Sequence, residues 1–102
     1  MDINVIKSLC EDATIEVTQH ILVRCQQRKI SYAEIKEVIK NGEIIEEYPD
    51  DYPYPSCLVF GMTINERKIH VVVGIGENKL WLITAYEPDT LQWDETFKKR
   101  KE

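Results

Sequence analysis

Several side chains that bind phosphate or exchange protons recur at regular positions in this sequence. His20, Arg24 and Arg28 follow one another four residues apart, so each step turns only about 40° around a helix and the three share one stripe. His70 lies in a later apolar run, and Tyr86 ends the run after it. Arginine binds phosphate through a permanently charged, bidentate fork, and histidine or tyrosine exchanges protons. The set fits metal-free RNA cleavage, in which a base, a cation and an acid act on one phosphodiester.

Each of these residues also has an interpretation without chemistry. A helix stripe of one histidine and two arginines is usually solvated surface. His70 is typical of a hydrogen-bonded residue in a core or groove, and Tyr86 of a strand-end residue packed against Pro88. The sequence has no P-loop, GxGxxG, HExxH or GxSxG motif, and two histidines are too few for a metal site built on histidine. We therefore expect no metal and no cofactor.

The composition is that of one small globular domain. The chain has 102 residues, 43% hydrophobic and 30% charged, with a net charge of −5. That charge argues against a nucleic-acid binder whose affinity comes from overall positive charge. An acidic block over 43–51 and a basic tail over 98–101 are each typical of solvated surface.

Cysteine usage and hydropathy bear on location. Three cysteines without CxxC spacing indicate small buried side chains in a reducing compartment. No apolar run reaches the length of a membrane span, and the N-terminus has no signal-peptide pattern. We expect a cytoplasmic protein with no membrane partner.

A buried β-hairpin is the most clearly patterned element of the second half of the chain. Two runs rich in β-branched and aromatic residues flank residues 77–78. The register decides whether Tyr86 reaches His70. If the loop is 77–78 alone, Tyr86 pairs opposite Ile69 and points away from the face of His70. If the loop is one residue longer, His70 pairs opposite Thr84 and Tyr86 lies on its side. The sequence leaves both registers open.

The other elements follow from apolar spacing and capping residues. Thr18 caps one helix, Ser31 and Glu34 form a capping box for the next, and Gly42 ends that helix in an expected left-handed conformation. The predicted helices cover 2–10, 19–28 and 31–41, and strands over 43–48, at a sheet edge, and 56–64 precede the hairpin. The loop between these two strands, 49–55, is rich in proline and tyrosine.

Helices followed by a meander predict an α+β domain. We expect the N-terminal helices to pack on one face of a four-stranded, twisted antiparallel sheet. The whole chain, 1–102, is expected to be a single domain. It would comprise an N-terminal helix and lead-in over 1–17, a core over 18–93 and a charged tail, or short helix, over 94–102.

Four segments, 18–31, 41–45, 67–72 and 83–88, together carry a resemblance. With a histidine, an arginine shortly before Ile30-Ser31, a strand histidine and a closing Tyr86-Glu87-Pro88, the chain resembles the bacterial domain of unknown function 4258. This small family is allied to the RelE/ParE-like toxin superfamily, and the similarity runs from about Thr18 to Trp93. The resemblance implies the compact RelE/ParE-type fold, with helices packed on a twisted antiparallel sheet.

The resemblance also implies a function. It implies the toxin of a bacterial toxin–antitoxin pair, with messenger-RNA cleavage by a metal-independent endoribonuclease as the family-level expectation. The implied partners are a cognate antitoxin, a zinc-finger protein of the YgiT type, and RNA or the ribosome. The catalytic candidates are His20, Arg28, His70 and Tyr86. The candidates for RNA binding are Arg24, Gln27 and Lys29.

Two other functions stay open. One is a non-catalytic protein-binding module, whose partner surface consists of the loop from Tyr48 to Tyr54 together with Trp93. The other is an inactive relic on the toxin-like fold.

Overall fold

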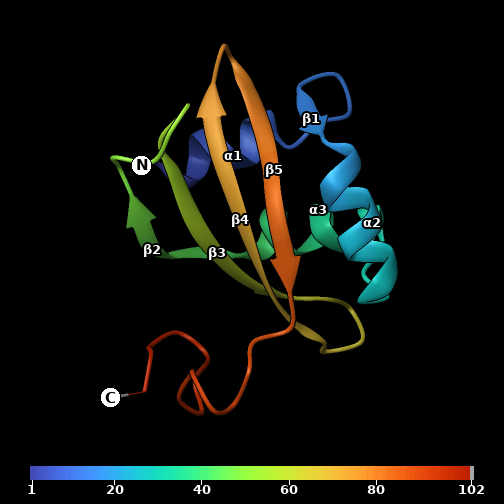
Figure 1. Cartoon of the computed structure of the whole chain (residues 1–102), viewed down its shortest axis with the longest axis vertical. Helices are drawn as coiled ribbons and strands as arrows, with labels where there is room; N and C mark the ends of the chain where they lie inside the picture. Colours follow the sequence, from blue (N-terminus) through green and yellow to red (C-terminus); the bar gives the residue numbers. More distant parts are fainter. Residues whose placement is uncertain (102) are drawn as a thin grey trace.

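Three helices and one five-stranded sheet make up the chain in a computed structural model that describes residues 1–101. The sheet has the strand order β1-β5-β4-β3-β2 (Figure 1). The α+β class predicted above is therefore confirmed. No helix in residues 1–101 combines the length and the apolarity that crossing a membrane requires. The elements are α1 (Ile3–Leu9), β1 (Ile15–Val17), α2 (Gln19–Gln27), α3 (Tyr32–Asn41), β2 (Glu43–Tyr48), β3 (Ser56–Met62), β4 (Lys68–Gly76) and β5 (Lys79–Tyr86).

Side-chain caps set where the second and third helices begin. The Thr18 hydroxyl accepts a hydrogen bond from the Ile21 N–H at the start of α2. At the start of α3, Ser31 accepts from the Glu34 N–H while the Glu34 carboxylate accepts from the Ser31 N–H, so the predicted capping box is present. Each cap satisfies backbone donors that the helix itself leaves unpaired.

The end of α3 differs from the prediction. Gly42 is not left-handed but extended, with φ −90° and ψ −179°. A glycine is needed there for space, because a Cβ would lie 2.4 Å from the Val38 carbonyl oxygen and 2.7 Å from that of Phe60. A left-handed residue does occur before α3, in the corner between α2 and α3, where Lys29 has φ 56°.

One face of the sheet packs against the helices. On this face Val59 of β3 pairs with Val71 of β4, and Gly61 pairs with Ile69. Burial raises the pKa of the Cys57 thiol, on the same face, to about 11, so this thiol behaves as an apolar side chain. The helices contribute to the same core Ile6, Cys10, Ile21, Cys25, Ile35, Val38 and Ile39.

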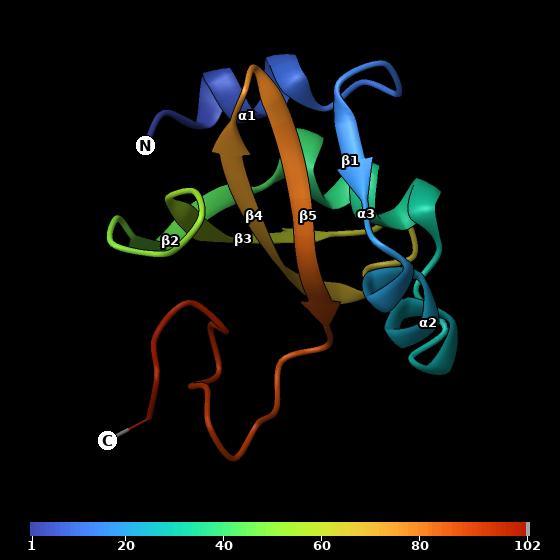
Figure 2. The same cartoon turned by 45° about the horizontal axis from the view of Figure 1, so that its top comes forward.

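The sheet has five strands rather than the four predicted, and it is not wholly antiparallel. β1 runs parallel to β5 at the sheet edge, with Ile15 beside Leu80 and Val17 beside Leu82 (Figure 2). The prediction missed β1 because three residues are too few for an alternating pattern to stand out. At the opposite edge lies β2, as predicted.

A bulge decides the register of the β4–β5 hairpin. Its loop is the two residues Glu77 and Asn78, both with positive φ (56° and 59°), as a type I′ turn requires. Without a bulge this loop would set Tyr86 opposite Ile69. The pairing shifts by one residue between Val72 and Val73, however, so His70 lies directly opposite Tyr86. The two-residue loop was one of the two alternatives that the sequence left open. The prediction that this loop points Tyr86 away from the face of His70 is wrong.

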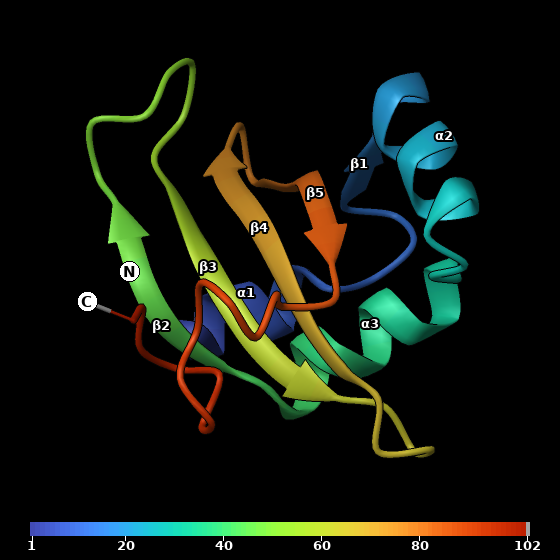
Figure 3. The ribbon, with the colours of Figure 1, turned by 60° about the horizontal axis from the view of Figure 1, so that its bottom comes forward.

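The last residues fold back over the other face of the sheet. In Figure 3 residues 88–101 cross in front of the strands, whereas α1 and α3 lie behind them. Trp93 is only 2% exposed and forms a β-bridge with Arg100. We call residues 88–101 the C-terminal strap. It contains no helix.

Candidate functional site

His70 lies at the centre of a buried aromatic cluster beneath the C-terminal strap. Its side chain is fully buried, and its ring meets those of Trp93, Tyr86 and Phe60 edge to face, with centroids 4.5, 5.4 and 5.7 Å away. Phe60 and Tyr86 flank it on β3 and β5. Trp93 comes from the strap, so strand pairing and the strap together build the cluster.

The hydrogen bond of His70 defines its tautomer. Its Nε2 lies 2.7 Å from the carbonyl oxygen of Phe97 in the strap. A carbonyl only accepts, so a neutral His70 carries its proton on Nε2 and leaves a lone pair on Nδ1. That buried Nδ1 has no hydrogen-bond partner among residues 1–101. Burial lowers the pKa of His70, although the bond to Phe97 opposes this. His70 is therefore a neutral imidazole with an unused proton-accepting atom.

Two other predicted site residues, Tyr86 and Arg28, lie near the end of β5. Burial raises the pKa of the Tyr86 phenol, which keeps its proton in place. The exposed Arg28, just after α2, extends its side chain to the end of β5, where Nη1 donates to the Ala85 carbonyl at 2.8 Å and to Thr84 Oγ1 at 3.3 Å. Arg28 thus bonds to the two residues that precede Tyr86, and its charge opposes the rise in the pKa of Tyr86. We call His70, Tyr86 and Arg28 the His70 cluster.

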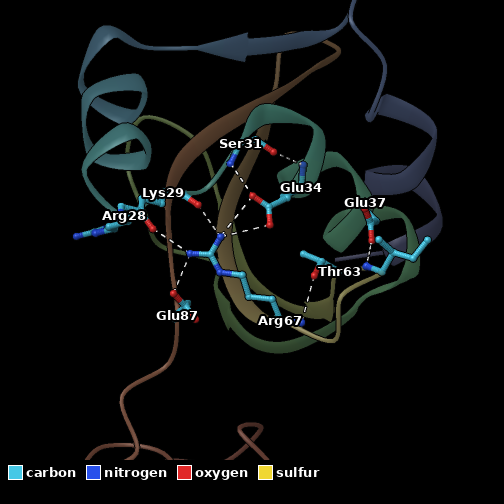
Figure 4. A network of polar contacts seen from close by, with 9 residues as sticks. Arg28, Lys29, Ser31, Glu34, Glu37, Thr63, Arg67 and Glu87 are labelled. Carbon is cyan, nitrogen blue, oxygen red and sulfur yellow. Dashed lines mark hydrogen bonds and ion pairs between the residues drawn. The ribbon is translucent and has the colours of Figure 1, made fainter.

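Arg67 bonds to the backbone of Arg28 and Lys29 (Figure 4). The sequence did not single out Arg67 as a candidate. Its guanidinium donates to the carbonyls of Arg28, at 2.9 Å, and Lys29, at 2.6 Å. It also pairs with Glu34 of α3, at 3.3 Å, and with Glu87 after β5, at 2.8 Å. One side chain therefore joins the α2–α3 corner to the end of β5. No local pattern signals this role, because its partners lie 20 to 39 residues away in sequence.

An ion pair fastens the strap over His70. Arg100 donates from Nε and Nη2 to the two carboxylate oxygens of Glu46, at 2.9 and 3.1 Å. Its guanidinium also lies 4.6 Å from the centre of the Trp93 ring. Lys98 pairs with Glu43 at 2.8 Å. The acidic block and the basic tail, each interpreted from the sequence as solvated surface, therefore pair with each other at two positions.

The remaining predicted site residues lie apart from the His70 cluster. His20 is exposed in the first turn of α2, and eight residues of helix separate it from Arg28 by about 12 Å along the axis. Arg24, Gln27 and Lys29 are also exposed. Within residues 1–101 none of these four side chains bonds to the cluster. They form a solvent-facing stripe.

The expected partner surface combined the loop after β2 with Trp93. Trp93 is buried between the strap and the sheet, so its place on an exposed surface is wrong. The loop after β2 does expose side chains, with Tyr52 92% exposed. No three His, Cys, Asp or Glu side chains in residues 1–101 gather as they would around a metal ion.

The chain is an α+β domain in which His70 and Tyr86 are in contact at one end of the sheet. Arg28 bonds to the end of the same strand as Tyr86. The sequence model of the family "Domain of unknown function (DUF4258)" matches residues 17–87, and the chain belongs to this family. No curated protein and no solved structure matches the chain. The matched region contains the whole His70 cluster, whereas the strap with Trp93 and Arg100 lies beyond it.

Proposed function

We propose that this chain is the toxin of a bacterial toxin–antitoxin pair of the RelE/ParE-like type, and that it cleaves RNA without a metal. The proposal is carried by the contact of His70 with Tyr86, a neutral imidazole and a protonated phenol whose ring centroids are 5.4 Å apart. The guanidinium of Arg28 bonds to Ala85, the residue before Tyr86. These are the base, acid and cation that phosphodiester cleavage needs.

The roles follow from the protonation states. A ring nitrogen of the neutral His70 takes the proton of the 2′-hydroxyl as its oxygen attacks phosphorus, and Tyr86 gives a proton to the leaving 5′-oxygen. Arg28 binds the phosphate with N–H groups that its bonds to Ala85 and Thr84 leave unused. The exposed side chains of Arg24, Gln27, Lys29 and His20 then bind the flanking RNA.

The strap has to leave the His70 cluster before RNA reaches it. His70 is fully buried and its Nε2 is bonded to the strap. In this proposal the substrate-bound state is one in which the strap has moved. The protein acts in the cytoplasm, on free or ribosome-bound messenger RNA. A cognate antitoxin, a zinc-finger protein of the YgiT type, holds it inactive.

Expression in bacteria tests the proposal. Induction of the native chain is expected to arrest growth, and the purified chain is expected to cut a labelled RNA in the presence of EDTA. Arg28→Gln should reduce both effects at least about tenfold, because one phosphate-binding cation is lost. Lys7→Gln, on the distant α1, is the matched control and should change neither. Normal growth at equal levels of folded protein, together with intact RNA, would contradict the proposal.

A second candidate function is a protein-binding module without catalysis. Two observations support it. His70 is completely buried, with its Nε2 already bonded to the Phe97 carbonyl, and Tyr52 in the loop after β2 is exposed. A growth effect that survives both Arg28→Gln and His70→Gln would favour this module. A chain with no growth effect, no RNA cleavage and no binding partner would be an inactive relic.

A further inference from the structure

An open aromatic groove lies on the same sheet face as His70, at the hairpin end. On β4, alternate residues share a face, so Gly74 lies on the side of His70, and Trp81 of β5 pairs with it. The groove encloses about 410 Å³. Its rim exposes 92% of Tyr52 and 42% of Ile83. The lining residues are Thr18, Tyr52, Pro53, Tyr54, Gly74, Trp81, Leu82 and Ile83.

The walls of the groove are fixed before any ligand binds. Tyr54 and Trp81 stack with ring centroids 5.3 Å apart. The Tyr54 hydroxyl donates to Glu77, and Trp81 Nε1 donates to the Gly76 carbonyl at 3.0 Å. A preformed site of this kind spends little of its binding energy on ordering side chains.

Gly74 lines the groove and is itself buried, so it lies at the base of the groove, which we call its floor. A Cβ at this position would meet only ordinary contacts, the nearest being Ile83 Cδ1 and the Pro55 carbonyl oxygen at 3.5 Å. The absence of a side chain is therefore not required by packing within residues 1–101. It leaves room for an apolar side chain from another molecule.

The charges around the groove indicate the sign of its ligand. In the acidic block, Glu43 pairs with Lys98, Glu46 with Arg100 and Glu47 with the N-terminal amine. The carboxylates nearest the groove differ, because Asp50, Asp51 and Glu77 have no cationic partner within residues 1–101, and Lys79 of the hairpin pairs instead with Glu16. The aromatic faces and these carboxylates attract the same kind of group, a cation.

We propose that this groove binds a segment of a partner protein that carries an arginine or lysine beside an apolar residue. The apolar side chain fills the space above Gly74, and the cation lies over Tyr52 and the Tyr54–Trp81 pair, toward Asp50 and Glu77. This binding is separate from RNA cleavage, since it uses none of the His70 cluster.

Selection from a phage-displayed library of random 12-residue peptides tests the proposal with the whole native chain as target. Bound peptides are expected to be enriched in arginine or lysine next to an apolar residue. A selected peptide should shift the indole N–H resonance of Trp81, identified with Trp81→Phe, and leave that of Trp93 in place. Failure to enrich any peptide, or enrichment of acidic peptides, would overturn the proposal.

Three variants outside the hydrophobic core provide the controls, one at the buried Gly74 and two at exposed positions. Gly74→Ala should weaken a selected peptide at least about fivefold, because its methyl group occupies the floor. Tyr52→Ser should weaken it roughly three- to fivefold by removing an exposed cation–π partner. Ile64→Ser, at an 86% exposed position in the β3–β4 turn, should change nothing.

Two other occupants would also overturn the proposal. If the Trp81 resonance shifts with protein concentration alone, the groove binds a second copy of this chain. If it shifts with an RNA oligonucleotide and not with the peptides, the groove is part of the RNA surface. Because Arg28→Gln leaves the groove intact, peptide binding by that variant separates this proposal from the toxin activity.

Discussion

The His70 cluster and the aromatic groove lie on one face of the same strands, yet the chain treats them in opposite ways. His70 and Gly74 are four residues apart on β4. At His70 the strap closes the face, and Trp93 is 2% exposed. At the hairpin end no strap covers the groove, and Tyr52 on its rim is 92% exposed, although Gly74 itself is buried. Both ends are rich in aromatic rings, so residue type does not decide which end is covered. The path of the strap does, because it crosses the sheet at His70, where Trp93 is buried and Arg100 pairs with Glu46.

The largest contrast is expected from removing one aromatic side chain at each end. Trp93→Ala should lower the free energy of unfolding by about 3 kcal/mol, since it empties a buried site. Tyr52→Ser should change it by less than about 0.5 kcal/mol, because the ring contributes little buried area. Urea unfolding followed by circular dichroism measures both. Similar values for the two variants would mean that the strap is not part of the core.

Two glycines of β4 sharpen the comparison within the groove end. In Gly76→Ala the new Cβ would lie 2.1 Å from the Tyr54 ring, so we expect a loss of about 2 kcal/mol as the Tyr54–Trp81 stack is displaced. Gly74→Ala should stay within about 0.5 kcal/mol of the native chain. Unfolding midpoints compare the two directly. Equal losses would show that the groove floor is packed rather than open.

Breaking the ion pair tests what holds the strap. Arg100→Gln is expected to cost about 1 kcal/mol, because it removes a partly exposed ion pair and a cation–π contact. It should also speed the reaction of His70 with diethyl pyrocarbonate, measured by mass spectrometry against the exposed His20 of the same molecule. Lys99→Gln, one residue away, is the control. An unchanged His70 rate in Arg100→Gln would mean that the strap is held by Trp93 alone.

Protonation of His70 should have the smallest effect, and its sign is fixed. Burial lowers the pKa of His70 below its ordinary value of 6.5, so the unfolded chain takes up the proton first as the pH falls. The contribution of neutral His70 to the free energy of unfolding is therefore fully present above about pH 6.5 and declines below it. Urea unfolding at about pH 7.5 and 5.5 should show this decline in the native chain but not in His70→Gln. The carboxylate of Glu46, whose pKa is lowered, titrates below this window.

Local patterns predicted most of the elements because their causes are local. Capping at Thr18 and Ser31 and the apolar runs of the hairpin depend on neighbouring residues, and they appear in the structure as expected. Local patterns did not predict β1 or the register of Tyr86. A three-residue strand has too little pattern to stand out, and the run of apolar residues in β5 does not show where the extra residue of a bulge lies.

Residue type selected the candidate side chains, but it did not give their geometry. Of the four catalytic candidates, His70 and Tyr86 are in contact, and Arg28 bonds to Ala85, the residue before Tyr86. His20 has the same chemistry but lies two helical turns from Arg28. The strap could not be predicted, because its contacts with His70 and Glu46 join positions 27 and 54 residues apart.

The sheet edges have a consequence for how this chain meets other chains. An unpaired strand edge is a template for fibril-like growth. Here one edge is β1, which is only three residues long. The other edge is β2, which is irregular between Ile44 and Glu46 and carries three glutamates, Glu43, Glu46 and Glu47. Neither edge offers a long, flat row of backbone groups. Self-assembly by strand addition is therefore disfavoured at both sides, and recognition is left to side chains on the faces.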